Sequence, residues 1–421
     1  MPQSVSTTTC RISRLGCAAS RCPRREYRES VPARRPALVE RMRPFTSTIF
    51  AEITALATRT GAINLGQGFP DTDGPDVILD TATAAIRGGL NQYPPGPGMP
   101  VLREAVAQHQ KRFYGLDVDP DTEVLVTAGA TEAIVATIMA LCEPGDEVVT
   151  FDPVYDCYAA SIALAGAVKR TVTLRWPDFA LDETRLRAAF GWRTRVVLVN
   201  TPQNPTGKVF DRAELELIAR LAREHDAVVV TDEVYEHQVF DDGVHVPIAT
   251  LPGMAERTVT ISSAGKTFSV TGWKVGWLHG TAELVAAARA VKQFLTFVSA
   301  GPFQPAVATG LGLGDDFYAA LAGGLQAKRD LLVEGLRAAG FAVSVPRGTY
   351  FAIADAAPLG FADGVELCQR LPELVGVAAV PVSVFYSDPT AAPSLVRFAF
   401  CKRDEVLHDA VERLSRLSAL L

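Results

Sequence analysis

The sequence predicts an α/β protein, with a mostly parallel, seven-stranded sheet between helices in a large domain and a smaller α+β domain after it. Two observations lead to this prediction. Short apolar runs alternate with helical stretches from residue 123 to residue 279, a pattern typical of βαβ units and a parallel sheet. Beyond residue 301 the alternation gives way to a long helical stretch and then to short strands, which indicates a separate domain.

The composition argues against several classes of protein. The chain has 421 residues, enough for two domains, and its 48% hydrophobic and 21% charged residues are ordinary for a globular protein. A net charge of −6 argues against nucleic-acid binding, which needs a concentrated basic face. No apolar run approaches the roughly 18 residues of a membrane span, and neither the cysteines nor the histidines have metal-ligand spacing. We therefore expect a cytoplasmic protein with reduced thiols and no metal site.

Residues 1–42 differ from the rest of the chain. Arginines crowd this stretch, acidic residues are few and apolar periodicity is absent, so we expect a disordered leader. A transit peptide has a similar composition, and Met42 is an alternative start of translation. We expect residues 43–70 to pack on the small domain, residues 71–300 to form the large domain and residues 301–421 to form the small one.

The expected elements follow from these patterns. The seven strands of the large domain cover residues 123–127, 147–151, 168–174, 195–199, 227–231, 257–262 and 275–279. Helices are expected at residues 44–58, 102–113, 133–141 and 212–224. In the small domain we expect one long helical stretch over residues 304–339 and strands over residues 341–345, 350–355 and 395–401.

Polar residues follow the predicted strands at their carboxyl ends. Asn204 belongs to a polar segment after one strand, Asp232 follows the next, and Lys266 lies between the last two strands. The carboxyl ends of parallel strands meet at one edge of an open sheet, where ligands bind. There a lysine can form a Schiff base with a carbonyl, and a carboxylate can keep a pyridinium nitrogen protonated. These are a protein's two main contributions to pyridoxal-phosphate chemistry.

With these motifs, the chain resembles the fold-type I, pyridoxal-phosphate-dependent aminotransferases of class I/II, from about Arg43 to the C-terminus. The likeness is greatest to the kynurenine, glutamine and methionine aminotransferases and to the actinobacterial N-succinyldiaminopimelate aminotransferases. The resemblance implies that pyridoxal phosphate is the cofactor and that Lys266, Asp232 and Tyr235 are catalytic. Lys266 would form the Schiff base and then move the substrate's proton, and Asp232 would pair with the pyridinium N1–H. Tyr235 and Asn204 would bind the ring oxygen O3′.

The resemblance also implies which residues hold the rest of the cofactor. Ala130 and Thr131 would bind the phosphate with their backbone amides, because a helix N-terminus offers free N–H groups and the positive end of a dipole. A simple strand-to-helix turn is the alternative interpretation of this segment. Ser263 would add a hydroxyl and Lys274 a charge to the phosphate site. Tyr155 would stack on the pyridine ring.

Substrate and partner residues are implied in the same way. Gly68, Asn204, Arg397 and Phe50 would bind the substrate, with Arg397 holding its α-carboxylate, since a buried arginine is costly unless it meets an anion. A structural salt bridge is the alternative for Arg397, and packing in the core is the alternative for Phe50. Tyr93 would reach the cofactor phosphate of a neighbouring subunit. The resemblance therefore implies a homodimer with shared active sites.

The implied function is transamination in a ping-pong cycle. The enzyme would move an amino group from an L-amino acid, of the N-succinyl-LL-diaminopimelate, glutamine, methionine, aromatic or kynurenine type, to a 2-oxo acid such as 2-oxoglutarate. A β-lyase acting on cysteine conjugates at the same site is the alternative. A non-enzymatic regulator is a third class, but it would need a fused DNA-binding helix-turn-helix, for which the basic leader is too short.

Overall fold

The seven apolar runs form one sheet in the computed structural model, with the strand order β2-β8-β7-β6-β5-β3-β4. Its strands are β2 (Val124–Thr127), β3 (Glu147–Asp152), β4 (Val168–Thr173), β5 (Thr194–Asn200), β6 (Val228–Asp232), β7 (Thr258–Ser263) and β8 (Gly276–His279). β8 pairs antiparallel with both of its neighbours, and the other neighbouring strands are parallel. The predicted fold class, α/β with a mostly parallel seven-stranded sheet, is confirmed.

The structure describes residues 36–46 and 48–420. Contacts within the chain group residues 40–421 into one unit, apart from residues 1–39. Most of the expected disordered leader lies outside the described residues, while its last part contributes to the short 3₁₀ helix η1 (Glu40–Phe45). No helix in the described part of the chain is long and apolar enough to cross a membrane.

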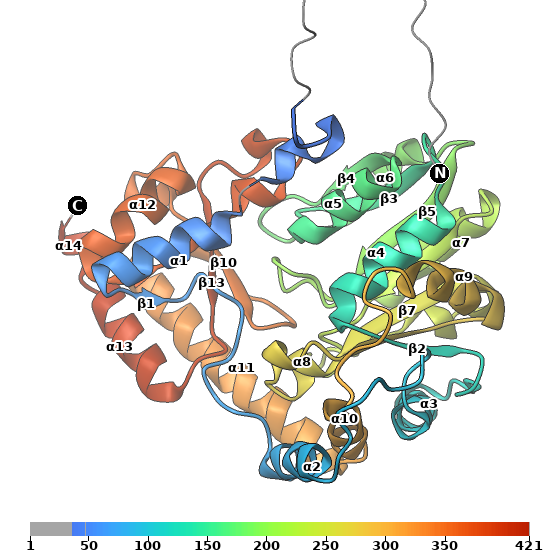
Figure 1. The fold of residues 1–421 in the computed structure, drawn as a ribbon. Helices are drawn as coiled ribbons and strands as arrows, with labels where there is room; N and C mark the ends of the chain where they lie inside the picture. The colour runs from blue at the N-terminus through green and yellow to red at the C-terminus, as the bar shows by residue number, and fades with distance from the viewer. Residues whose placement is uncertain (1–35, 47, 421) are drawn as a thin grey trace, which may run out of the picture. The chain divides into compact units, whose positions relative to one another are not determined.

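Helices cover both faces of the large sheet. On one face α4 (Gly129–Leu141) packs between α5 (Asp156–Ala165) and α9 (Ala282–Lys292), as Figure 1 shows. On the other face α7 (Arg212–Glu224) buries Leu215 and Ile218. The strands between these layers are rich in valine and are buried along both sides, as expected for a parallel sheet covered on both faces.

A second, smaller sheet has the strand order β12-β13-β10-β9. Its strands are β9 (Ala342–Ser344), β10 (Phe351–Asp355), β12 (Val380–Pro381) and β13 (Leu395–Ala399). Figure 1 shows it among α1 (Ile49–Thr60), α11 (Asp315–Ala338), α12 (Gly364–Val375) and α13 (Asp404–Leu414). Beside it, β1 (Ile63–Asn64) pairs with β11 (Val377–Ala378), so the N-terminal segment joins residues from the C-terminal part of the chain.

The expected helix over residues 304–339 is two helices, α10 (Phe303–Leu311) and α11. Gly312 ends the first helix and Gly314 begins the second, and glycine costs about 1 kcal/mol relative to alanine inside a helix. The break therefore occurs where two glycines give the sequence a low helix propensity. One hydrophobic core cluster contains both Val199 of the large sheet and Ile353 of the small one, so the division at residue 301 stays a prediction.

The remaining elements connect these layers. They are the helices α2 (Asp76–Arg87), α3 (Pro100–Tyr114), α6 (Glu183–Ala189), α8 (Ala264–Thr267) and α14 (Leu417–Leu420), together with the 3₁₀ helices η2 (Ile248–Thr250), η3 (Ala255–Arg257), η4 (Thr271–Trp273), η5 (Ala357–Leu359), η6 (Val382–Phe385) and η7 (Pro389–Ala391). α8 is short, but it holds Lys266 directly after β7.

Candidate active site

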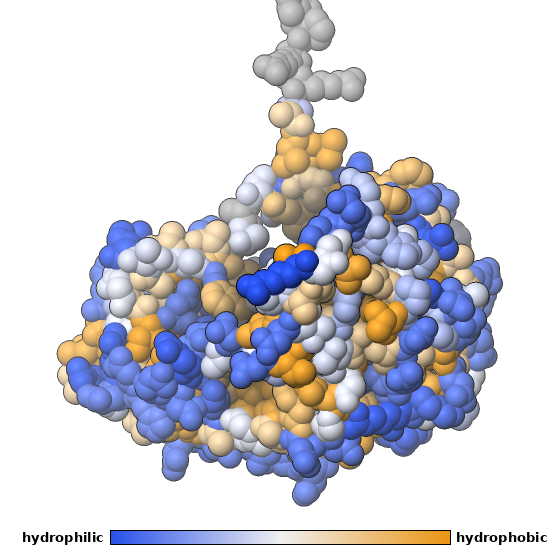
Figure 2. Space-filling view, turned by 60° about the horizontal axis from the view of Figure 1, so that its bottom comes forward, coloured by the Kyte–Doolittle hydropathy of each residue, from blue (hydrophilic) through white to orange (hydrophobic). Residues whose placement is uncertain are grey.

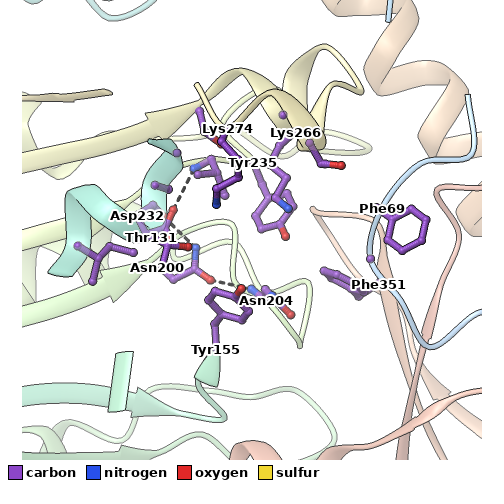
Figure 3. Close-up of a pocket in the computed structure, with 18 of the residues that line it drawn as sticks. Phe69, Thr131, Tyr155, Asn200, Asn204, Asp232, Tyr235, Lys266, Lys274 and Phe351 are labelled. Atoms are coloured by element: carbon purple, nitrogen blue, oxygen red, sulfur yellow. Dashed lines mark hydrogen bonds between the residues drawn. The ribbon is translucent and has the colours of Figure 1, made fainter. Parts of the chain in front are cut away.

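A pocket of about 1050 Å³, including space open to solvent, lies at the carboxyl ends of β5, β6 and β7 and at the start of α4. Twelve residues expected from the sequence line it, and they are Phe50, Gly68, Ala130, Thr131, Tyr155, Asn204, Asp232, Tyr235, Ser263, Lys266, Lys274 and Arg397. Figure 3 shows Asp232, Thr131 and Asn200 on one side of the pocket and Phe69 and Phe351 on the other.

Asp232 is the last residue of β6 and is 5% exposed. Its Oδ2 accepts a hydrogen bond from the Tyr158 hydroxyl at 2.7 Å, and its Oδ1 accepts one from the Val234 amide at 3.3 Å. Burial raises the pKa of Asp232 to about 6, although both hydrogen bonds favour the ionised form. At neutral pH the pocket therefore contains a buried carboxylate that can stabilise a positive charge.

Lys266 lies in α8, between β7 and β8, with its Nζ 5.9 Å from the centre of the Tyr235 ring. The Gln238 side-chain amide donates to the Lys266 carbonyl at 2.8 Å, which fixes the backbone at this residue. Burial lowers the pKa of Lys266, and the charges of Lys274 and Arg397 act in the same direction, while the nearby Asp232 opposes them. The lowered pKa favours the neutral amine, which is the nucleophilic form.

The start of α4 forms a cradle for an anion. Gly129 has φ +76°, and a Cβ on it would stand 3.1 Å from the Nζ of Lys274. A Cβ on Gly276 would stand 2.5 Å from the Gly129 carbonyl carbon, so β8 approaches the helix start too closely for a side chain. The N-cap residue Ala128 makes no side-chain cap to α4. The helix amides and the Lys274 ammonium therefore converge where a phosphate can bind.

Arg397 lies in β13 and is 1% exposed. Its guanidinium donates to Asn204 Oδ1 at 2.9 Å and to the Gly66 carbonyl at 2.8 Å, while its Nε is buried without a partner. Burial lowers its pKa to about 10. No carboxylate among residues 48–420 lies within 4.0 Å of it, so the alternative of a structural salt bridge is not found. A buried cation that lacks an anion suits a carboxylate ligand.

Aromatic rings surround this arginine. Its Cζ lies 4.1 Å from the centre of the Phe351 ring, 5.1 Å from Phe385 and 5.3 Å from Phe50. Phe50 lines the pocket and also packs against the hydrophobic core. Phe50 therefore packs against the core at the edge of the pocket, and its role in substrate binding stays a prediction.

One predicted residue lies apart from the pocket. Tyr93 is 82% exposed, and its ring meets Phe297 edge-on with 5.6 Å between centroids. Its expected role at a neighbouring subunit's cofactor stays a prediction.

Several lining residues were not predicted from the sequence, among them Tyr158, Asn200, Phe69 and Phe351. Asn200 donates to the Asp232 carbonyl at 2.8 Å. Asn200 ends β5 at the position paired with Asp232 at the end of β6. The expectation that polar residues at the carboxyl ends of strands face a ligand therefore applies to Asn200 as well as to Asp232. The signal for Tyr158 was its position three residues after Tyr155, on the same side of a helix start.

The residues of the pocket fit pyridoxal phosphate. The Gly129 cradle and Lys274 match a phosphate, Asp232 matches a protonated ring nitrogen, and Lys266 offers an amine whose pKa is lowered. Tyr155, whose ring lies edge-on to that of Tyr158 with 6.0 Å between centroids, presents an aromatic face to the same space. The pocket thus has a partner for the anionic group, the ring and the aldehyde of this cofactor.

Comparison with known proteins agrees with this geometry. The family model "Aminotransferase class I and II" matches residues 60–414. The chain is 54% identical, over 392 residues, to a "probable N-succinyldiaminopimelate aminotransferase" of Mycobacterium tuberculosis, with 90% of this chain and 98% of that protein covered. It is 42% identical over 371 residues to the methionine aminotransferase of Escherichia coli, with 88% and 96% covered.

Solved structures show the same likeness. The N-succinyldiaminopimelate aminotransferase of Mycobacterium tuberculosis superposes with a TM-score of 0.89 and 55% identity, covering 90% of this chain and all of that one. A methionine aminotransferase of Escherichia coli has a TM-score of 0.87 and 41% identity, covering 91% of this chain and all of that one.

Proposed function

The chain belongs to the class I and II aminotransferases, which depend on pyridoxal phosphate, and we propose that its amino donor is N-succinyl-LL-diaminopimelate and its acceptor 2-oxoglutarate. The observation that carries this choice is the 54% identity to the mycobacterial relative over nearly its whole length. Methionine or an aromatic amino acid is the second candidate donor. It is favoured by the three phenylalanines Phe50, Phe69 and Phe351, which line the pocket.

Each residue of the pocket has a distinct task in this proposal. When bound, pyridoxal phosphate supplies an aldehyde that takes the amino group and a ring that withdraws electrons from the substrate. Asp232 keeps the ring nitrogen protonated, while Tyr235 and Asn204 bind the ring hydroxyl. The amides of Ala130 and Thr131, the Ser263 hydroxyl and the Lys274 ammonium hold the phosphate, and Tyr155 covers one face of the ring. The lining of the pocket by all of these residues supports the assignment.

Substrate binding and proton transfer complete the proposal. Arg397 takes the α-carboxylate, with its orientation set by Asn204 and by the Gly66 carbonyl. Gly68 lets the backbone approach the substrate, and Phe50 forms part of the wall. Lys266 is the base that takes the proton from the substrate's Cα, and its burial favours the neutral amine that this step needs.

We also propose a homodimer whose two chains share their active sites. Tyr93, Phe294 and Phe297 are exposed by 82%, 83% and 52%, and exposed aromatic residues close together are typical of an interface. In Figure 1, α2 and α10 lie at the bottom of the view, and Figure 2 brings this side forward. Figure 2 shows hydrophobic residues exposed among hydrophilic ones. A cytoplasmic location is part of the proposal, in line with the free thiols of Cys142, Cys157, Cys368 and Cys401.

A panel of single half-reactions tests the donor. N-succinyl-LL-diaminopimelate, methionine, kynurenine, glutamine and glutamate are each mixed with the holoenzyme, and the absorbance change of the cofactor is followed. The proposal expects the highest kcat/KM with the first donor. A higher value with methionine or kynurenine would replace it with the second candidate. A β-lyase would instead release pyruvate and ammonia from a cysteine conjugate and form no amino-acid product.

Complementation tests the shared sites. Lys266→Ala and Tyr93→Ala chains are each expected to be impaired. In a mixed dimer, one site combines an intact Lys266 with the partner's intact Tyr93, so mixing the two variants should restore activity. Light scattering should give twice the mass of one chain. No recovery on mixing, together with a monomer mass, would contradict the proposal.

A further inference from the structure

A polar cluster with no part in the proposed chemistry lies behind the turn that carries Asp232 and Tyr235. Glu236 and His237 directly follow Tyr235 in the chain, and His109 comes from α3. One ligand atom from each of these three side chains lies within 4.8 Å of the others. His109 and Glu236 are buried, and His237 is half-buried. Because residue 109 is far from residues 236 and 237 in sequence, no local spacing rule could have revealed this cluster.

Glu236 is a buried carboxylate whose bonds all come from neutral groups. The Tyr114 hydroxyl donates to its Oε2 and the Ser262 hydroxyl to its Oε1, each at 2.7 Å. Among residues 48–420, no lysine, arginine or histidine nitrogen lies within 4.0 Å of its carboxylate oxygens. A buried charge in proteins is normally paired or bound to a metal, so Glu236 lacks a cation.

The two histidines can each offer a ring nitrogen to a ligand. Their Nε2 atoms face each other at 2.7 Å, and only one hydrogen can lie between them, so at least one lone pair points into the cluster. A ring lone pair of this kind is the group that a metal ion binds.

A neighbouring amide can select the tautomer that a metal needs. The Gln110 Nε2 lies 3.3 Å from His109 Nδ1, and the Gln110 Oε1 is buried without a partner. Rotation of this amide by half a turn would place Oε1 against an Nδ1–H, which leaves the Nε2 lone pair free. A carbonyl oxygen on the second ring nitrogen is the usual support of a metal-binding histidine.

Other charges near the cluster are already compensated. Arg112 lies over the ring of Tyr318, which packs against His237, and its guanidinium is paired with Asp315. Glu233 is paired with His245 at 2.8 Å. The remaining carboxylate is that of Glu236, which lies close to the two imidazole rings.

From these contacts we propose that His109, His237 and Glu236 bind one first-row divalent cation of the zinc class. Two imidazoles and one carboxylate are a donor set that Zn²⁺ accepts, with bonds of about 2.0–2.2 Å. Tetrahedral ligands of one such ion lie about 3.3–3.6 Å apart by these lengths. The two histidine nitrogens, now 2.7 Å apart, would therefore separate slightly, and the longer spacings within 4.8 Å would close, through side-chain rotations. The half-buried His237 gives access from solvent.

Such an ion would join α3 to the turn that follows β6. His109 and Tyr114 belong to α3, while Glu236 and His237 continue the segment that holds Asp232 and Tyr235. The ion would therefore brace the cofactor-binding turn from behind without touching the cofactor. This role is independent of which amino acid is the substrate.

The test is metal binding by the full-length holoenzyme. The protein is stripped with a chelator, freed of the chelator and titrated with ZnCl₂, with the bound metal counted by mass spectrometry and the melting temperature recorded. We expect one Zn²⁺ per chain and a higher melting temperature. His109→Gln and His237→Gln should each weaken binding at least about tenfold, since loss of a mere supporting residue already costs 10–100-fold. The matched control is His408→Gln, at an exposed position on α13, which should bind as the wild type does.

A conservative third variant keeps the test decisive if a histidine variant folds poorly. Glu236→Gln retains groups that can bond Tyr114 and Ser262 but removes the charge, so it should fold and still bind Zn²⁺ more weakly. Substoichiometric binding by the wild type would overturn the proposal. So would equal binding by the wild type and by the folded variants, because the metal would then lie elsewhere, for instance on the cofactor.

Discussion

The Tyr158 hydroxyl donates a hydrogen bond of 2.7 Å to Asp232 Oδ2, which joins the first turn of α5 to the last residue of β6. Both side chains are buried, with 3% and 5% of their surface exposed. The bond favours the ionised carboxylate and so opposes the effect of burial on the pKa of Asp232. Tyr158 is thus a positioning residue for the carboxylate that pairs with the ring nitrogen in the proposed function.

Replacing Tyr158 by phenylalanine should slow transamination. A hydrogen bond to a charged group contributes about 1.5–3 kcal/mol, which corresponds to a loss of roughly 10-fold to 150-fold in kcat. The pKa of Asp232 in the apoprotein should also rise above its value of about 6. Carboxyl titration followed by infrared absorption would measure that rise, and an unchanged pKa would show that the hydroxyl has only a packing role.

Cofactor affinity should depend on pH through Asp232. Its raised pKa of about 6 means that the carboxyl of the apoprotein is neutral below pH 6 and cannot pair with a pyridinium charge. Affinity for pyridoxal phosphate should therefore increase as the pH rises through 6, and the Asp232→Asn variant should lack this part of the dependence. Fluorescence titration of both apoproteins between pH 5 and pH 8 would measure the difference.

The same raised pKa affects the stability of the apoprotein. A carboxyl whose folded pKa exceeds its unfolded value stabilises the fold at low pH, and this contribution is lost as the pH rises through the folded pKa. Between pH 4 and pH 6 the melting temperature of the wild type should therefore fall relative to that of Asp232→Asn. Parallel melting curves over this range would contradict the pKa of about 6.

Asp232→Asn should affect the chemical step more than cofactor affinity. Asparagine can bond the ring nitrogen but cannot stabilise its positive charge, and a charge-assisted bond contributes about 2–3 kcal/mol. The loss affects mainly the transition state, in which the negative charge formed at the substrate's Cα spreads into the cofactor ring. We therefore expect kcat to drop at least about 30-fold to 150-fold. Cofactor methylated at N1, whose ring is permanently cationic, should restore part of the rate. A variant that simply fails to bind cofactor would refute the electronic role.

The sequence predicted the site residues whose position depends on a local pattern, and not those that the fold brings in from elsewhere in the chain. Asp232 and Lys266 follow apolar strands directly, so the local pattern locates them. Tyr158 meets Asp232 only in the folded chain, where the first turn of α5 reaches the end of β6, and no local pattern records that contact. The split of residues 304–339 into α10 and α11 occurs at Gly312 and Gly314, which interrupt an otherwise helical pattern.

Lys266→Ala should abolish transamination and leave the fold intact. The side chain lines the pocket from the short helix α8, whose backbone is held by Gln238, so its removal should not unfold the site. Circular dichroism should match the wild type, and the absorbance band of the lysine-bound cofactor should be missing. Turnover near the wild-type rate would exclude Lys266 as the base.

Gly68→Ala should weaken substrate binding through Phe351. A Cβ on Gly68 would stand 2.3 Å from the Phe351 ring, whose centre lies 4.1 Å from the Arg397 Cζ. The ring must move, and with it the packing that orients the arginine. Overpacking of this kind costs about 1–3 kcal/mol, so KM for the amino donor should rise roughly 5-fold to 150-fold while kcat changes less. The matched control is Gly323→Ala in α11, where a Cβ meets nothing within 4 Å. Equal KM values for the two variants would show that Phe351 does not orient Arg397.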